Sequence, residues 1–202
     1  MDIDMKAMKA EIGGAFVLTW VVFGMGLGTL SGAVALAVTW MAFSGAHLLP
    51  VVTWSHIMTG DLSDTEGNWM ANGMRLVAQV AGAALAVVLM TEAGAVGDGF
   101  TSTEMWIPDI GDNIWGVLAT VAAGAIWWQV HTRCDSAWAS AFGLMIVGGA
   151  MTLGGADSMG NSLVGALDGI ADTAANWICD GLFVGIGAYL GCQIDGLIGE
   201  EE

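Results

Sequence analysis

Long stretches without a charged side chain are the feature that most limits how this chain can fold. No Asp, Glu, Lys or Arg occurs between Glu11 and Asp61. Four further apolar stretches contain at most one charge each: 67–91, 113–132, 136–156 and 173–194. A helix needs about 20 mostly apolar residues to cross about 30 Å of hydrocarbon, so the first stretch allows two crossings and each of the others allows one. The spacing predicts an all-α membrane protein with six transmembrane helices.

Two apolar segments are too short to cross a membrane, and they lie at 48–58 and 158–167. Lipid cannot satisfy exposed backbone groups, so a short segment that dips into the membrane must be buried in protein or line a water-filled cavity. We predict that both segments are re-entrant half-helices. The alternative is that each is a tight loop between helices.

Basic residues are scarce, and their positions predict the orientation of the chain. The sequence is 55% apolar, has only four Lys and Arg, and carries a formal charge of −16. With six spans, Lys6, Lys9, Arg75 and Arg133 all fall on one side, which the positive-inside tendency makes cytoplasmic. We therefore expect a multi-pass protein of the cell membrane with both termini in the cytoplasm. The negative charge excludes nucleic acid as a partner.

The chain reads as one channel domain, 1–202, built from two similar halves at about 8–92 and 112–198. Glu11-Ile-Gly-Gly-Ala opens the first half and Asn113-Ile-Trp-Gly-Val opens the second. Their third spans also match, as Val80-Ala-Gly-Ala-Ala-Leu and Gly185-Ile-Gly-Ala-Tyr-Leu. Because each half has three spans, the second half is expected upside down, as an inverted repeat with a transport site at the midplane.

Two half-helices that enter from opposite faces would meet at the bilayer centre by their N-termini. Each N-terminus offers unpaired backbone N–H groups and about half a positive charge. Such a centre repels cations and attracts hydrogen-bond acceptors, which favours neutral solutes.

The segment that begins at Ser44 reads Ser-Gly-Ala-His-Leu-Leu-Pro-Val-Val-Thr. It resembles the first pore loop of the aquaporin and glycerol-facilitator family, Ser-Gly-x-His-x-Asn-Pro-Ala-Val-Thr. In this resemblance His47 and Pro50 keep the family residue, Leu49 stands for Asn, and Val51 stands for Ala. The opening Glu11-Ile-Gly-Gly and the third-span Ala78-Gln-Val-Ala-Gly-Ala are also similar to the family.

The second pore loop departs further from the family pattern. Laid on the family motif, Ser158, Met159 and Gly160 replace Asn, Pro and Ala, and Asn161 stands where the family has its filter arginine. Gly155 falls on another filter position. The resemblance then implies a wider, neutral filter, and a central constriction that is apolar on the side of Leu49.

The resemblance also implies residues that hold the pore loops. Glu11 would accept backbone N–H groups of the first loop, Asn113 would do the same in the second half, and Gln79 would be an anchoring amide. A simple interfacial carboxylate is the alternative for Glu11. Asp157, directly before the expected second half-helix, is interpreted as a helix cap or as an acid facing the outer mouth.

The three histidines are interpreted separately. His47 matches a family residue that shapes the loop and presents its carbonyl to the pore, with a pH sensor as the alternative. We expect His56 to pack on the cytoplasmic side and His131 to lie at the interface.

These features predict a passive channel for water, or for small uncharged solutes such as glycerol, embedded in the lipid bilayer. The resemblance implies a homotetramer with one pore in each subunit. An ion-leaky, cation-permeable channel and a non-conducting structural protein remain alternatives. No phosphate loop, nucleophile with a base, metal site or cofactor motif stands out, so we do not expect an enzyme.

Overall fold

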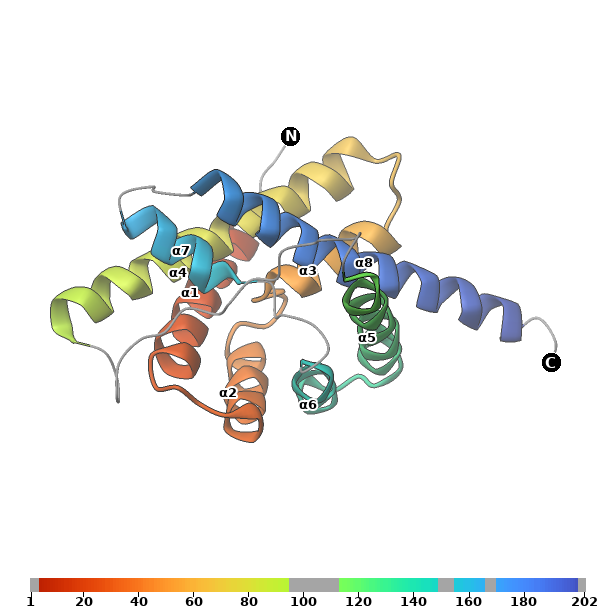
Figure 1. Cartoon of the computed structure of the whole chain (residues 1–202), viewed down its shortest axis with the longest axis horizontal. Coiled ribbons are helices and arrows are strands. Elements are labelled where there is room, and N and C mark those ends of the chain that lie inside the picture. The colour runs from red at the N-terminus through yellow and green to blue at the C-terminus, as the bar shows by residue number, and fades with distance from the viewer. Residues whose placement is uncertain (1–3, 95–112, 149–154, 166–169, 200–202) are drawn as a thin grey trace.

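The computed structural model describes residues 4–94, 113–148, 155–165 and 170–199 (Figure 1). Within these residues all regular structure is helical, as predicted. The α-helices are α1 (Met5–Leu18), α2 (Thr29–Ala42), α3 (Pro50–Thr59), α4 (Ala71–Ala93), α5 (Ile114–Arg133), α6 (Ala137–Val147), α7 (Ala156–Val164) and α8 (Ile170–Gly199). Two π-helical segments, η1 (Thr19–Phe23) and η2 (Thr65–Met70), extend α1 and precede α4.

Three helical stretches are long and apolar enough to cross a membrane. They are Thr65–Ala93, Ile114–Arg133 and Ile170–Leu197, with 29, 20 and 28 residues. Two of the other expected spans form shorter apolar helices, since α2 has 14 residues and the described part of α6 has 11. The first expected span continues from α1 into η1, and it contains Lys6, Lys9 and Glu11.

Side chains at the helix starts explain several of the observed boundaries. Asp4 accepts the backbone N–H groups of the first turn of α1, Asp64 does so for η2, and Ser136 does so for α6. Such caps satisfy donors that have no partner inside the helix. Pro50 occupies the first position of α3, where its missing N–H costs no hydrogen bond.

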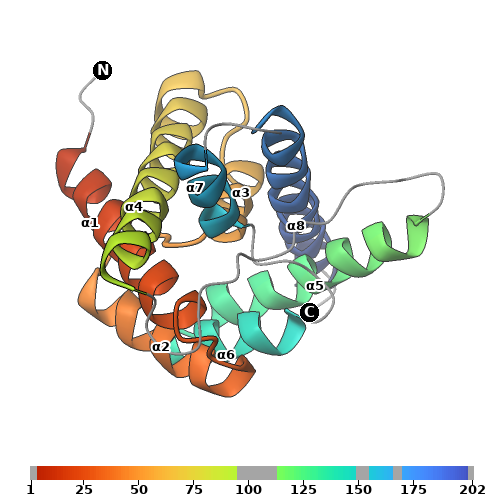
Figure 2. The ribbon, with the colours of Figure 1, turned by 60° about the vertical axis from the view of Figure 1, so that its left-hand side comes forward.

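The helix contacts of the first four helices recur in the last four. Helix α1 packs on α4 as α5 packs on α8, and α3 packs on α8 as α7 packs on α4. Helices α2 and α6, the second of each half, pack on each other. Figure 2 shows α7 and α3 lying between α4 and α8. Exchanging the two halves therefore leaves the set of main contacts unchanged.

Glycines mark the register of this relationship. A Cβ on Gly82 of α4 would collide with the backbone of Ile12 in α1, and a Cβ on Gly187 of α8 would collide with the backbone of Val121 in α5. Gly82 and Gly187 are the matched glycines of the two third spans. Ile12 therefore corresponds to Val121, which places the counterpart of Glu11 at Thr120.

A glycine lies at the contact of each short helix with its long neighbour, on the short helix α7 in one case and on the long helix α8 in the other. A Cβ on Gly160 of α7 would lie 2.7 Å from the backbone nitrogen of Ala84 in α4. A Cβ on Gly185 of α8 would lie 2.7 Å from the backbone oxygen of Trp54 in α3. Small residues at such contacts let helix backbones approach closely.

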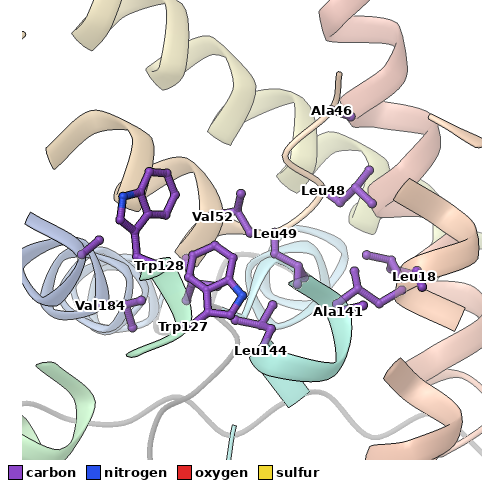
Figure 3. Close-up of a cluster of buried hydrophobic side chains, with 14 of the residues drawn as sticks. Leu18, Ala46, Leu48, Leu49, Val52, Trp127, Trp128, Ala141, Leu144 and Val184 are labelled. Atoms are coloured by element: carbon purple, nitrogen blue, oxygen red, sulfur yellow. The ribbon is translucent and has the colours of Figure 1, made fainter. Parts of the chain in front are cut away.

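The main apolar cluster joins both halves at the centre of the fold. Leu49, Val52, Trp127, Leu144 and Val184 belong to it and are at most 6% exposed. Figure 3 shows Leu49 surrounded by side chains of this cluster. The loop before α3 therefore contributes directly to the core.

Candidate functional site

Glu11 lies at the base of the loop that leads into α3. Its carboxylate is fully buried and accepts the backbone N–H of His47 at 2.6 Å and that of Leu48 at 2.8 Å. The contact that the resemblance implied for Glu11 is therefore present, and the carboxylate is not a simple interfacial group. It satisfies two buried donors that would otherwise be expensive to leave unpaired.

Two side chains of α4 complete the network around this carboxylate. Arg75 Nη1 donates to Glu11 Oε1 at 2.7 Å and to the carbonyl of Gly45 at 2.9 Å. Gln79 Nε2 donates to Glu11 Oε2 and to the hydroxyl of Thr53, both at 2.9 Å. Gln79 is thus the anchoring amide that was predicted. Arg75 served above only to predict the orientation of the chain in the membrane. It is a second anchor, four residues before Gln79 on the same face of the helix.

The anchored loop holds one residue in an unusual backbone conformation. Leu48 has a φ of 69°, in the left-handed region, and its side chain is fully buried. A left-handed conformation costs a residue with a Cβ roughly 1–2 kcal/mol. The bond from its N–H to Glu11 stabilises this turn, which aims the following Leu49 toward the centre.

His47 forms hydrogen bonds to other parts of the protein through its backbone and its ring. The indole N–H of Trp40 lies 3.1 Å from the carbonyl of Ala46 and 3.2 Å from that of His47. The ring Nδ1 of His47 lies 3.1 Å from the hydroxyl oxygen of Thr53. His47 is therefore tied to the protein through its N–H, its carbonyl and its ring.

Helix α3 begins where the first motif predicted. Leu49 is its N-cap and has no capping side chain, Pro50 is its first residue, and Val51 is fully buried. The apolar side chain at position 49 enters the core, in agreement with the expected apolar wall.

Helix α7 begins three residues earlier than the motif alignment predicted. Its N-cap is Gly155, whose φ of 51° is one that glycine adopts without strain, and its first residue is Ala156. Ser158, Met159 and Gly160 therefore lie inside the helix, so the alignment that placed them at its start is wrong. The structural counterparts of Leu49, Pro50 and Val51 are Gly155, Ala156 and Asp157.

This shift moves the other predicted residues of the second loop. Gly155 is a helix cap and has no side chain to line a filter. The position directly after the motif, which was assigned to Asn161, becomes Ser158. Asn161 is exposed on α7. Asp157 is the second residue of α7 and is 1% exposed, so it lies neither before the helix nor at an outer mouth.

Asn113 was expected to hold the second loop, whose residues 149–154 lie outside the described part of the chain. The side chain of Asn113 is exposed and caps α5 by accepting the N–H of Gly116 at 3.2 Å. The residue that occupies the position equivalent to Glu11 is Thr120, which is 7% exposed and whose hydroxyl donates within α5 to the carbonyl of Gly116 at 3.0 Å. The sequence match of Glu11 with Asn113 was out of register by seven residues.

The N-terminal ends of α3 and α7 line one small cavity, which we call the central cavity. Its volume is about 10 Å³, and its walls are Ala15, Leu18, Thr19, Phe23, Leu48, Leu49, Gly155, Ala156 and Asp157. A neighbouring apolar cavity of about 10 Å³ shares Leu18, Phe23 and Leu49. Each is about the size needed for a single water molecule.

A larger pocket of about 570 Å³, here called the vestibule, lies beside the loop before α3. Its lining includes Ser44, Trp40, Cys134, Asp135 and Ser140. The vestibule also contains all three histidines of the chain. The rings of His47 and His56 stack with centroids 4.1 Å apart, and His131 meets His56 edge-on at 6.0 Å.

The histidine cluster was missed by interpreting each histidine alone. His131 comes from the second half of the chain, and its Nδ1 lies 2.9 Å from the hydroxyl of Ser140. No spacing in the sequence links 131 to 47 and 56, because a contact between two halves has no local period. Among the described residues, no group of three His, Cys, Asp or Glu has a geometry that could hold a metal ion.

Comparison with known proteins adds no assignment to this geometry. No family model matches the chain, and no curated protein matches it significantly.

Proposed function

We propose that this chain is a multi-pass protein of the cell membrane that forms a passive pore for water and small uncharged solutes. In this proposal α1 with η1, α2, α4, α5, α6 and α8 are six spans, and α3 and α7 are re-entrant half-helices of an inverted repeat. Three spans in each half place the halves in opposite orientations. The exchange of contacts between the halves supports this plan.

Exposed apolar side chains support a bilayer around the outside of the bundle. Leu30, Val77, Trp115, Ile126 and Ile146 are 59–80% exposed, and they come from four different helices. Such a surface is typical of contact with lipid or with another subunit. We propose that lipid contacts most of this apolar surface and that the other subunits of a homotetramer contact the remainder.

Basic side chains support cytoplasmic termini and a cytoplasmic vestibule. Arg75 donates to Gly45, and Arg133 directly follows Thr132, so both border the vestibule. Lys6 and Lys9 lie within two turns of Glu11, the partner of Arg75. All four therefore gather toward one end of the bundle, as the positive-inside tendency requires.

The central cavity is the observation that carries the pore proposal. Two helix N-termini from different halves converge on it, and the first turn of a helix generally has backbone N–H groups without a partner inside the helix. Neutral molecules with hydrogen-bond acceptors are favoured at such a point. The size of the cavity favours water over glycerol as the main permeant.

A non-conducting structural protein is the second candidate, and one observation favours it. The side chain of Leu49 is 6% exposed, belongs to the main apolar cluster and lines the central cavity. If this cluster never opens, no solute passes.

Osmotic shrinkage of proteoliposomes decides between the two candidates. Vesicles containing the purified chain should shrink faster than protein-free vesicles in stopped-flow light scattering after a sucrose shock. Water flux equal to that of protein-free vesicles would reject the pore and favour the structural protein. A parallel shock with glycerol measures the size limit.

A further inference from the structure

Asp157 places a buried carboxyl group at the centre of the proposed pore. It is 1% exposed, and it lines the central cavity together with Thr19 and with Leu48 and Leu49 of the opposite half. The proposed water pathway needs neutral hydrogen-bonding groups at this point. It does not need an acid there, so this residue calls for a role of its own.

The positive side chains of the protein lie elsewhere. Arg75 pairs with Glu11, and Arg133 pairs with Asp195 on α8. Lys6 and Lys9 are exposed on the first turns of α1. These four are the only Lys and Arg of the chain. The positive potential at the central cavity therefore comes from the ends of α3 and α7.

The charges at the centre nearly balance. Each helix N-terminus contributes about half a positive elementary charge, so the two together contribute about one. An ionised carboxylate contributes one negative charge. The positive ends of half-helices are a barrier that excludes protons and other cations from a water pore. Ionised Asp157 cancels most of that barrier.

Cavity size selects which cation can use this site. The central cavity of about 10 Å³ holds one water molecule and has no room for a hydrated metal ion. A proton passes along water without needing more space than the water itself. Its binding to a carboxylate needs no other reactant.

We propose that Asp157 is a proton-binding site at the centre of the pore and that the chain conducts protons as well as water. A proton leaves water on one side, binds the Asp157 carboxylate, and passes to water on the other side, which restores the carboxylate. The electrochemical gradient drives the net flow. This inference rests on the proposed function, because water must reach the central cavity from both sides.

Proton flux in proteoliposomes tests the inference separately from water flux. Vesicles loaded with potassium and a pH-sensitive dye are diluted into low-potassium buffer with valinomycin, so that potassium leaves and protons are drawn in. Wild-type vesicles should acidify faster than protein-free ones. Asp157→Asn, which keeps the shape of the side chain, should lower acidification to the protein-free rate and so lower the ratio of proton flux to osmotic water flux.

Two control variants separate the site from a general effect of buried acids. Asp157→Glu keeps the carboxyl group and should retain proton flux. Asp180→Asn removes a carboxylate that is 2% exposed on α8 and does not line the central cavity, so proton flux should persist. Unchanged proton flux in Asp157→Asn would overturn the inference and leave Asp157 as a group that stabilises the helix ends.

The wild type alone also decides the matter if Asp157→Asn does not fold. Wild-type water flux without proton flux would overturn the inference while the proposed function stands. Absence of both fluxes would reject the pore itself, and the proton site with it.

Discussion

Glu11 Oε2 accepts the backbone N–H of Leu48 at 2.8 Å, although 37 positions separate the two residues. The bond ties the first helix to a left-handed turn directly before α3. It makes the position of the turn depend on one buried carboxylate.

Replacing this carboxylate by an amide should destabilise the protein. In Glu11→Gln one of the two acceptor oxygens becomes a donor, which leaves a buried N–H unpaired and Arg75 without its counter-charge. We expect a loss of about 1–3 kcal/mol, seen as a lower midpoint in thermal unfolding in detergent. Glu66→Gln, at an exposed carboxylate of η2, is the matched control and should leave the midpoint unchanged. Equal midpoints for both variants would contradict the anchoring role.

Shortening Leu49 should increase water flux. Its side chain lines both small cavities, so Leu49→Ala joins them and removes an apolar barrier. Lowering that barrier by about 1.4 kcal/mol would raise the flux about tenfold. The measurement is the osmotic shrinkage rate per protein. Leu85→Ala, at a side chain 56% exposed on α4, should not change it. A flux in Leu49→Ala no higher than in Leu85→Ala would place the barrier elsewhere.

Modifying Cys134 should block the proposed pore from the cytoplasmic side. This thiol is exposed and lines the vestibule, whereas Cys179 and Cys192 are half-buried. A bulky, membrane-impermeant thiol reagent should therefore reduce flux in inside-out vesicles and leave right-side-out vesicles unaffected. Cys134→Ser should resist the reagent. Inhibition from the opposite side would reverse the proposed orientation.

Adding a methyl group at Gly187 should weaken the contact between α5 and α8. A Cβ there collides with the backbone of Val121, which cannot move as a side-chain end can. We expect Gly187→Ala to lower the free energy of unfolding by about 1–3 kcal/mol. At Gly73, also helical, no atom lies within 4 Å of the new Cβ. There the same substitution should stabilise by about 0.5–1 kcal/mol, since alanine favours helix over glycine. The measurement is the thermal unfolding midpoint, which should fall in Gly187→Ala and rise in Gly73→Ala.

Two arginine substitutions distinguish the two registers of the second pore loop. The register seen in the structure predicts that Ser158→Arg narrows the proposed outer constriction and lowers glycerol flux more than water flux. Asn161→Arg, on an exposed position three residues later, should leave the ratio of the two fluxes unchanged. A change in the flux ratio in Asn161→Arg but not in Ser158→Arg would support the motif alignment instead. Stopped-flow shrinkage and re-swelling measure both fluxes on the same vesicles.

Charge spacing in the sequence predicted the order and approximate limits of the helices, because charged side chains are excluded from apolar helical faces. It also predicted two short segments where α3 and α7 lie, whereas the link from Glu11 to the loop before α3 was implied only by the resemblance of the motifs. Three helical stretches meet the length and apolarity of a span, and the six-span plan stays a prediction. The connection between the two predicted halves, at about 92–112, lies mostly outside the described part of the chain.

The second half was harder to predict, for a physical reason. Pro50 marks the first position of α3, whereas α7 begins at a glycine and an alanine, which carry no comparable signal. Motif letters alone therefore placed Ser158 at the helix start. The N-cap at Gly155 fixes the register of α7, and the packing of Gly82 and Gly187 on neighbouring backbones fixes the register of α5 relative to α1. The histidine cluster could not be predicted from the sequence, because it depends on a contact between the two halves.

The crossed packing of the short helices has a consequence for how the chain acquires its fold during synthesis. Helix α3 leaves the ribosome early but packs mainly on α8, which emerges after the other described helices. Helix α7 finds its principal neighbour, α4, already made. Until α8 is in place, the first half lacks the surface that buries Trp54 and its neighbours. We therefore expect a nascent chain that stops before α8 to be recognised by quality control, even though its first four helices are complete.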